Sequence, residues 1–172
     1  MTIQNAYFTF NGREQQVQDF LGSKHLTDGN LSVEFNKLVP FVPPNQGLGG
    51  PECRFDIKVD GFKVGSINFT LTPEMETPTI IYDGHFGYFI QVQHRMKGYA
   101  SRALRLLLPV VLNDFKMTPV YICTTNDNIA SRRVMEKAGG IYRGYLKVPE
   151  QPEHTDLFRE EGVSHTHSYK FE

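Results

Sequence analysis

The sequence predicts an α/β protein of the α+β type, and two observations support this fold class. Residues 86–140 alternate twice between a β-rich run and an amphipathic helical pattern, which gives a β-α-β-α unit. Before it, residues 54–72 form two β-rich runs joined by Asp60-Gly61, a dipeptide that suits a tight hairpin turn. The length of 172 residues fits one domain. We therefore expect a single domain over 1–172, in which the sequence specifies the N-terminal extension 1–30 poorly.

The composition is that of a globular protein, with 40% hydrophobic residues, 22% charged residues and a net charge of -1. This balance argues against a general attraction to nucleic acid or to an anionic membrane, so any anion site must be local. No apolar run approaches the roughly 20 residues that span a bilayer. Cys53 and Cys123 are too few for a secreted disulfide scaffold, and the N-terminus lacks a signal-peptide pattern. We expect a cytoplasmic protein whose partners include no membrane and no nucleic acid.

Strand patterns dominate the N-terminal half of the sequence. The first residues suggest a strand at 3–10 and a short helix at 14–21, and residues 31–35 alternate between apolar and polar as a strand does. A segment rich in proline and glycine, 41–52, predicts a loop. After the hairpin, the aromatic and β-branched run HFGYFIQV predicts a strand at 85–92.

A helix follows this strand, and one face of it is apolar. Pro109 lies within the pattern and removes one backbone hydrogen bond, so we expect a bend there and not an end, because the periodicity continues. A strand at 119–125 and a helix that stops at Gly139-Gly140 come next, and a final strand pair is expected at 141–147 and 166–171. The residues of the apolar face, at spacings of three and four, are Ala100, Ala103, Leu104, Leu107, Leu108, Val111 and Phe115.

The stretch QHRMKGYASRAL, residues 93–104, opens this helix and combines positive charge with a glycine. A helix N-terminus leaves backbone N–H groups unbonded beside the positive end of the helix dipole, which favours an anion such as a pyrophosphate. Gly98 lets the backbone approach a ligand, and Arg95 and Lys97 add charge. A generic solvated helix start is an equally simple interpretation. Neither standard nucleotide loop, G-x-x-x-x-G-K-[ST] or G-x-G-x-x-G, is present.

Two segments resemble the cofactor motifs of the GNAT acetyltransferase superfamily. YFIQVQHRMKGYASRALRLLL, residues 88–108, resembles motif A, Arg/Gln-x-x-Gly-x-Gly/Ala, with Arg95, Gly98 and Ala100 at its defining positions. NDNIASRRVMEKAGG, residues 126–140, resembles the second cofactor-side motif. The matching residues of that motif are Asn128, Ser131, Glu136, Lys137 and Gly139.

This resemblance covers residues 86–145 and implies the GNAT fold, with that segment as the cofactor-binding core. The fold has a central mixed, largely antiparallel sheet, helices on both faces, and a parallel strand pair that splays apart from near Phe86 and Val120. The co-substrate implied is acetyl-CoA, with its pantetheine along residues 90–92 and its pyrophosphate on the amides of 96–101. The residues implied to bind it are Ile90, Gln91, Val92, Arg95, Met96, Lys97, Gly98, Tyr99, Ala100, Ser101 and Asn128.

The implied activity is an N-acetyltransferase, in which a primary amine of a small molecule or a peptide attacks the thioester directly. Many GNAT enzymes have a tyrosine as general acid in the second helix, and this sequence has Met135 there. Ser131 is a candidate to act on the leaving thiolate, although a serine there can simply satisfy the first helical turn. His85, with an ordinary pKa near 6.5, is a candidate base, although an ordinary strand histidine is the simpler interpretation. Tyr88 and Tyr99 are alternative polar groups.

Other functions are less well supported by the sequence. His165 and His167 share one strand face, but no third ligand can be assigned, so we expect no metal site. Cys123 lies in an apolar strand and is interpreted as a small buried hydrophobe. The absence of the usual tyrosine keeps a non-catalytic CoA-binding or acyl-CoA-binding module open as an alternative, and a homodimer is a reasonable guess.

Overall fold

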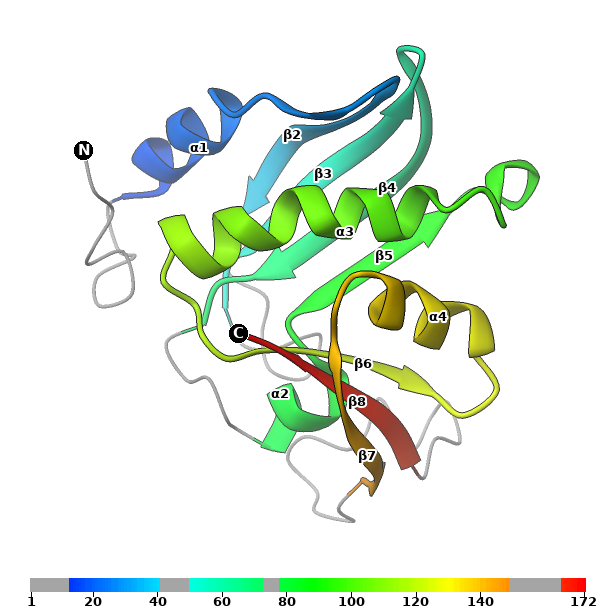
Figure 1. The fold of residues 1–172 in the computed structure, drawn as a ribbon. Helices are drawn as coiled ribbons and strands as arrows, with labels where there is room; N and C mark the ends of the chain where they lie inside the picture. The colour runs from blue at the N-terminus through cyan, green and yellow to red at the C-terminus, as the bar shows by residue number, and fades with distance from the viewer. Residues whose placement is uncertain (1–12, 41–49, 73–77, 149–164) are drawn as a thin grey trace.

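The structure is a computed structural model that describes residues 13–40, 50–72, 78–148 and 165–172 (Figure 1). It confirms the α+β class. The described strands form two antiparallel sheets where one central mixed sheet was expected. The strand predicted at 3–10 and most of the loop predicted at 41–52 lie outside the described residues.

The larger sheet has five strands that follow one another in chain order, each antiparallel to the next. The hairpin expected at 54–72 is confirmed: Asp60 and Gly61 form its turn, and both have positive φ. The strand expected at 85–92 is shorter, because the chain turns into a 3-10 helix, η1, at Val92–His94. The strands are β1 (Leu26–Asp28), β2 (Leu31–Val39), β3 (Glu52–Val59), β4 (Phe62–Thr70) and β5 (Phe86–Ile90).

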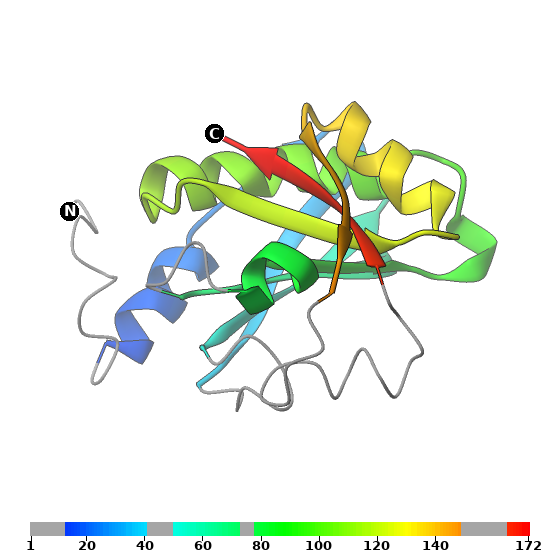
Figure 2. The same cartoon turned by 90° about the horizontal axis from the view of Figure 1, so that it is seen from below.

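The smaller sheet contains β6 (Val120–Thr125), β7 (Ile141–Lys147) and β8 (His165–Phe171). Its order is β6-β8-β7, so the last strand in the sequence lies in the middle. Helix α2 (Pro78–Asp83) contacts β6 and β8, and α4 (Ile129–Lys137) contacts β6. Figure 2 shows these two helices on opposite sides of the sheet, as the expectation of helices on both faces requires.

Helix α3 (Tyr99–Pro109) covers one face of the larger sheet, and α1 (Glu14–Gly22) lies against β2. All seven residues predicted for the apolar face of α3 and its extension are buried. They pack against inward-facing side chains of β2 to β4, such as Val33, Phe55 and Ile67. At Pro109 the α-helix gives way to a π-helical turn, η2 (Val110–Asp114), which is the physical form of the expected bend.

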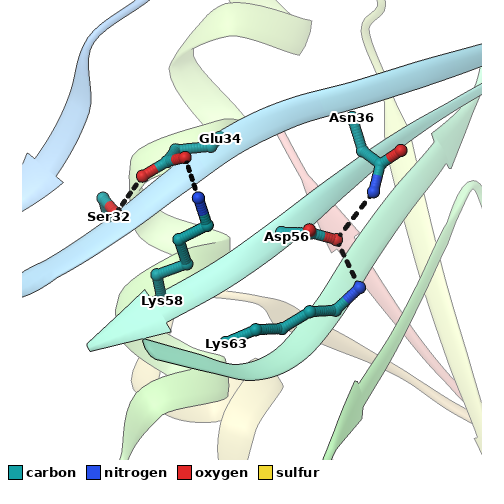
Figure 3. A network of polar contacts seen from close by, with 6 residues as sticks. All are labelled: Ser32, Glu34, Asn36, Asp56, Lys58 and Lys63. Carbon is teal, nitrogen blue, oxygen red and sulfur yellow. Dashed lines mark hydrogen bonds and ion pairs between the residues drawn. The ribbon is translucent and has the colours of Figure 1, made fainter. Parts of the chain in front are cut away.

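The opposite face of the larger sheet carries paired charges (Figure 3). Glu34 on β2 pairs with Lys58 on β3, and Asp56 pairs with Lys63 on β4 at 2.6 Å. The amide of Asn36 donates to the same Asp56 carboxylate at 3.0 Å. These contacts link three neighbouring strands side by side. The charges of Glu34, Lys58, Asp56 and Lys63 are thus paired within the sheet, so we assign these residues no ligand.

No helix in the described ranges is long and apolar enough to cross a membrane.

Candidate functional site

The two sheets meet where β5 and β6 begin. Gly84 forms an isolated antiparallel bridge with Ile122, and the backbone N–H of His85 donates to the carbonyl of Tyr121 at 2.6 Å. A Cβ on Gly84 would lie 2.8 Å from the backbone N of Cys123, so only glycine permits this approach. We call Gly84, His85, Tyr121 and Ile122 the strand junction.

Beyond the strand junction, β5 and β6 diverge (Figure 1). β5 is the last strand of the larger sheet and β6 is an outer strand of the smaller one, so each has one edge with no ladder partner among the described strands. The parallel pair predicted from near Phe86 and Val120 is not among the hydrogen-bonded pairings of those strands, and it stays a prediction. An unpaired strand edge presents N–H and C=O groups, which suit a ligand that carries amides.

The turn between β5 and α3 has the backbone geometry of an anion site. Gly98 is the N-cap of α3 with φ of 78°, and no side chain caps the helix. The first hydrogen bond onto this cap is from the N–H of Arg102 to the Gly98 carbonyl, so the amides between them have no partner inside the helix. A Cβ on Gly98 would meet only the Ser101 hydroxyl, at 3.9 Å. The predicted pyrophosphate site therefore has an open backbone and a helix N-terminus.

The charged side chains near this turn are not all directed at it. The Nε of Arg95 donates to the carbonyl of Ile90 at 3.0 Å, at the end of β5, and its guanidinium lies 5.8 Å from the ring of Phe89. Lys97 is exposed. The hydroxyl of Ser101 donates to the Gly98 carbonyl at 2.9 Å. Backbone amides, with Lys97 nearby, are therefore the donors that this conformation offers to an anion.

Ser131 lies in the first turn of α4, and its side chain joins that helix to β5. Its hydroxyl lies 2.7 Å from the hydroxyl of Tyr88, which also donates to the Ser131 carbonyl at 3.3 Å. The Ser131 N–H donates to the side-chain oxygen of Asn128, so Asn128 caps the helix and Ser131 does not. Burial raises the pKa of Tyr88 to about 12, and the hydrogen bond with Ser131 partly opposes this rise. A neutral pair of hydroxyls thus lies beside the divergent strands.

His85 lies at the strand junction, and only 1% of its surface is exposed. Its Nδ1 accepts a hydrogen bond from the Tyr121 N–H at 3.0 Å, which places its proton on Nε2, an atom with no hydrogen-bond partner among the described residues. Burial lowers the pKa of His85 to about 4. The base role predicted for His85 stays untested. In this conformation neither ring nitrogen is free to accept a proton from an amine.

Three further predictions concern residues outside this constellation. Met135 is fully buried, so the position of the usual tyrosine belongs to the core. His167 is hydrogen-bonded to Tyr142 and Asn126, and no group of three potential metal ligands exists among the described residues. Cys123 was predicted to be a small buried hydrophobe; its exposure is intermediate, and burial of the thiol raises its pKa to about 12. The sequence did not predict the contact of Tyr88 with Ser131. Alternation along β5 indicates which face of the strand Tyr88 occupies, but not which helix packs on that face.

Residues 4–141 match the family model described as "Acetyltransferase (GNAT) domain". No curated protein matches the chain.

Three solved structures illustrate the likeness in fold. A GNAT-family acetyltransferase from Bacillus anthracis is 22% identical with a TM-score of 0.50. The matched region covers 69% of this chain and 64% of the Bacillus chain, and coverage is given below in the same order. Mycobacterium smegmatis RimJ in complex with CoA-disulfide is 17% identical with a TM-score of 0.52, with coverage of 70% and 52%. RimL, a ribosomal L7/L12 alpha-N-protein acetyltransferase in complex with coenzyme A, is 17% identical with a TM-score of 0.50, with coverage of 70% and 61%.

The chain thus spans between 52% and 64% of the length of these proteins. The family match extends over most of the 172 residues and ends beyond the second cofactor-side motif. The protein is a member of the GNAT acetyltransferase family.

Proposed function

We propose that this protein transfers the acetyl group of acetyl-CoA to a primary amine of a small molecule or a peptide. The observation that carries the proposal is the open turn at Gly98, where helix amides without a partner inside the helix follow soon after β5, a strand with one edge unpaired among the described strands. Membership of the GNAT family supports the acyl donor, and so do the similar RimJ and RimL structures, which are complexes with CoA-disulfide and with coenzyme A. RimL is a ribosomal L7/L12 alpha-N-protein acetyltransferase, which supports a peptide acceptor.

The residues present fit the parts of acetyl-CoA. The amides of 96–101 and the charge of Lys97 would hold the pyrophosphate at the N-terminus of α3. Ile90, Gln91 and Val92, which run from the end of β5 into η1, would lie along the pantetheine. Gln91 is bonded through its N–H to Val64 and through its carbonyl to His94, so the free edge of β5 would supply the backbone partners of the pantetheine amides. Arg95 would bind a phosphate after leaving the Ile90 carbonyl. Asn128 would contact the pantetheine through its amide nitrogen, because its oxygen caps α4.

In the proposed reaction the amine nitrogen forms a bond to the carbonyl carbon, and the bond from that carbon to sulfur breaks. The electron pair of the broken bond moves to sulfur, and the amine loses a proton. Ser131 is the group proposed to stabilise the sulfur, because its hydroxyl is held beside the divergent strands. We assign the amine proton to water or to a group on the acceptor, because Nδ1 of His85 already accepts the Tyr121 N–H and Nε2 carries the ring proton.

A non-catalytic CoA-binding module remains the second candidate. The burial of Met135 and the enclosed position of His85 favour it, because they leave the described residues without the usual tyrosine and without an evident base. Release of free thiol from acetyl-CoA only when an amine is added would exclude this candidate.

The test of the proposal combines a titration with a matched pair of glycine variants. Calorimetry with acetyl-CoA and CoA would be followed by thiol release with polyamines, aminoglycosides, amino acids and short peptides. Gly98→Ala should weaken acetyl-CoA binding at least about tenfold, since a methyl group enters the anion site and the backbone resists positive φ.

The control for this titration is Gly139→Ala. Gly139 also has positive φ, and a Cβ there meets nothing within 4 Å, but it follows the C-terminus of α4. Gly139→Ala should leave the affinity for acetyl-CoA within about twofold of the native value, because Gly139 lies outside the anion site. Both variants carry similar backbone strain, so a difference between their affinities reports the site itself. Equal affinities for Gly98→Ala and the native protein would remove the turn from the site.

A further inference from the structure

We infer that Tyr88 is a positioning residue that acts through Ser131: it holds the serine hydroxyl so that the serine hydrogen is directed at the sulfur of the acyl donor. The inference rests on the proposed function, because it assigns a role within that reaction. It concerns a contact between a strand and a helix, β5 and α4, that lie far apart in the sequence.

The geometry fixes Ser131 from two sides. Its backbone N–H is bound by Asn128 at 3.0 Å, and its hydroxyl and carbonyl oxygens both lie within reach of the Tyr88 hydroxyl. Only 8% of Ser131 is exposed, so its side chain has little freedom to turn elsewhere. Ser131 is therefore held through its backbone by Asn128 and through its side chain by Tyr88.

The direction of the bond between the hydroxyls follows from their chemistry. The Tyr88 hydroxyl has one hydrogen, and two Ser131 oxygens lie within its reach: the hydroxyl at 2.7 Å and the carbonyl, which can only accept, at 3.3 Å. The shorter distance makes the hydroxyl the main acceptor, and the carbonyl is the weaker branch of a shared bond. A phenol is also a more acidic hydroxyl than an aliphatic alcohol, and hence the better donor. With Tyr88 as donor to the Ser131 oxygen, the single hydrogen of Ser131 stays free for another acceptor.

Tyr88 serves this purpose without giving up its proton. Its pKa of about 12 keeps the phenol neutral from pH 6 to pH 9, so the phenol retains the hydrogen that it donates to Ser131. An ordinary thiol has a pKa near 8.5, so a thiolate would not draw the proton from a group that is far less acidic. The negative sulfur would accept a hydrogen bond from Ser131, Ser131 would accept one from Tyr88, and no proton would leave either residue.

The kinetic test is a double-mutant cycle of Tyr88→Phe, Ser131→Ala and the double variant. Phenylalanine keeps the ring of Tyr88 and removes only the hydroxyl, so the strand should remain folded. Tyr88→Phe should lower kcat about tenfold, with KM for acetyl-CoA changed less than twofold, and the double variant should be no slower than Ser131→Ala alone. Multiplicative losses, or a larger loss for Tyr88→Phe than for Ser131→Ala, would overturn the inference.

A binding test needs no amine acceptor. A hydrogen bond from Ser131 favours the thiolate, so the affinity for CoA relative to desulfo-CoA should rise about tenfold between pH 6 and pH 9 in the native protein. In Tyr88→Phe the affinity for CoA relative to desulfo-CoA should rise by less than about threefold over the same pH range, which is half of the native rise on a logarithmic scale. Tyr142→Phe, which loses a phenol bound to His167, should match the native protein.

The outcomes of the binding test separate the inference from the proposed function. Failure of the native protein to bind CoA or acetyl-CoA would overturn both. Binding of CoA with the same pH dependence in the native protein and in Tyr88→Phe would overturn the role of Tyr88 and leave the acetyltransferase proposal standing.

Discussion

At the scale of residues, three polar side chains of the candidate site are bound to partners within the chain. Asn128 caps α4, Ser131 is bound to Tyr88, and Arg95 is bound to the end of β5. The backbone amides at the start of α3 differ, because no side chain caps that helix. Binding of an anion at Gly98 would therefore satisfy donors without first breaking a capping bond there.

His85 should make the stability of the protein depend on pH. Its pKa is about 4 in the folded chain and near 6.5 when unfolded, so between these values only the unfolded chain binds the proton. The free energy of unfolding should fall by up to about 3 kcal/mol as the pH drops from 6.5 to 4, and this contribution is fully present above pH 6.5. Urea denaturation at pH 7, 6, 5 and 4 would measure it.

His85→Asn is the control for this titration. Its side-chain oxygen can still accept the Tyr121 N–H, and it carries no titratable group. The difference in stability between the native protein and this variant should shrink or reverse with acid. A constant difference from pH 7 to pH 4 would show that His85 titrates normally and is not enclosed.

Part of the site could be predicted from the sequence at this scale. Gly98 and the helix start after it follow from local rules, because a positive φ and an uncapped N-terminus depend on a few neighbouring residues. The contact of Tyr88 with Ser131 does not, because the two residues are 43 positions apart. The enclosure of His85 depends on β6 in the same way.

At the scale of elements, α3 shows what periodicity predicts best. Its apolar face is buried as its spacing indicates, and Pro109 alters the helix at the expected place. The sequence predicted the class of most of the described helices and strands, but it missed β1, α2 and η1, and it did not predict which sheet each strand joins. That assignment depends on pairings such as Ile122 with Tyr169, between strands separated by α4 and β7.

Removal of one side chain from this apolar face should be costly. Leu107 is fully buried, and Leu107→Ala should lower the free energy of unfolding by about 2–5 kcal/mol, because the cavity left behind cannot fully collapse. Arg105→Ala, on the exposed face of the same helix, should change it by about 0.5 kcal/mol or less. Urea denaturation of both variants at pH 7 would check this, and equal losses would contradict the orientation of α3.

At the scale of the whole molecule, the two sheets are joined at the strand junction and separate beyond it. A ligand between the divergent edges would contact both sheets. Addition of acetyl-CoA should therefore slow amide hydrogen exchange most strongly in β5, in residues 96–101 and in β6, because their exposed N–H groups gain partners.

Hydrogen exchange followed by mass spectrometry would measure this effect, with β1 and β2 as the internal control. These strands lie at the far end of the larger sheet, so their local exchange should change little. An equal slowing in all peptides would indicate stabilisation of the fold in general and not a ligand bound between the sheets.

The central place of β8 has a consequence for the order of assembly. The larger sheet is built from neighbours in sequence, so its pairings can form as soon as residues 26–90 exist. The smaller sheet cannot form in this way, because β6 and β7 pair with β8 and not with each other. During synthesis both strands must wait for residues 165–171; until then β7 has two open edges, and β6 is held only at the strand junction, so both can pair with other chains.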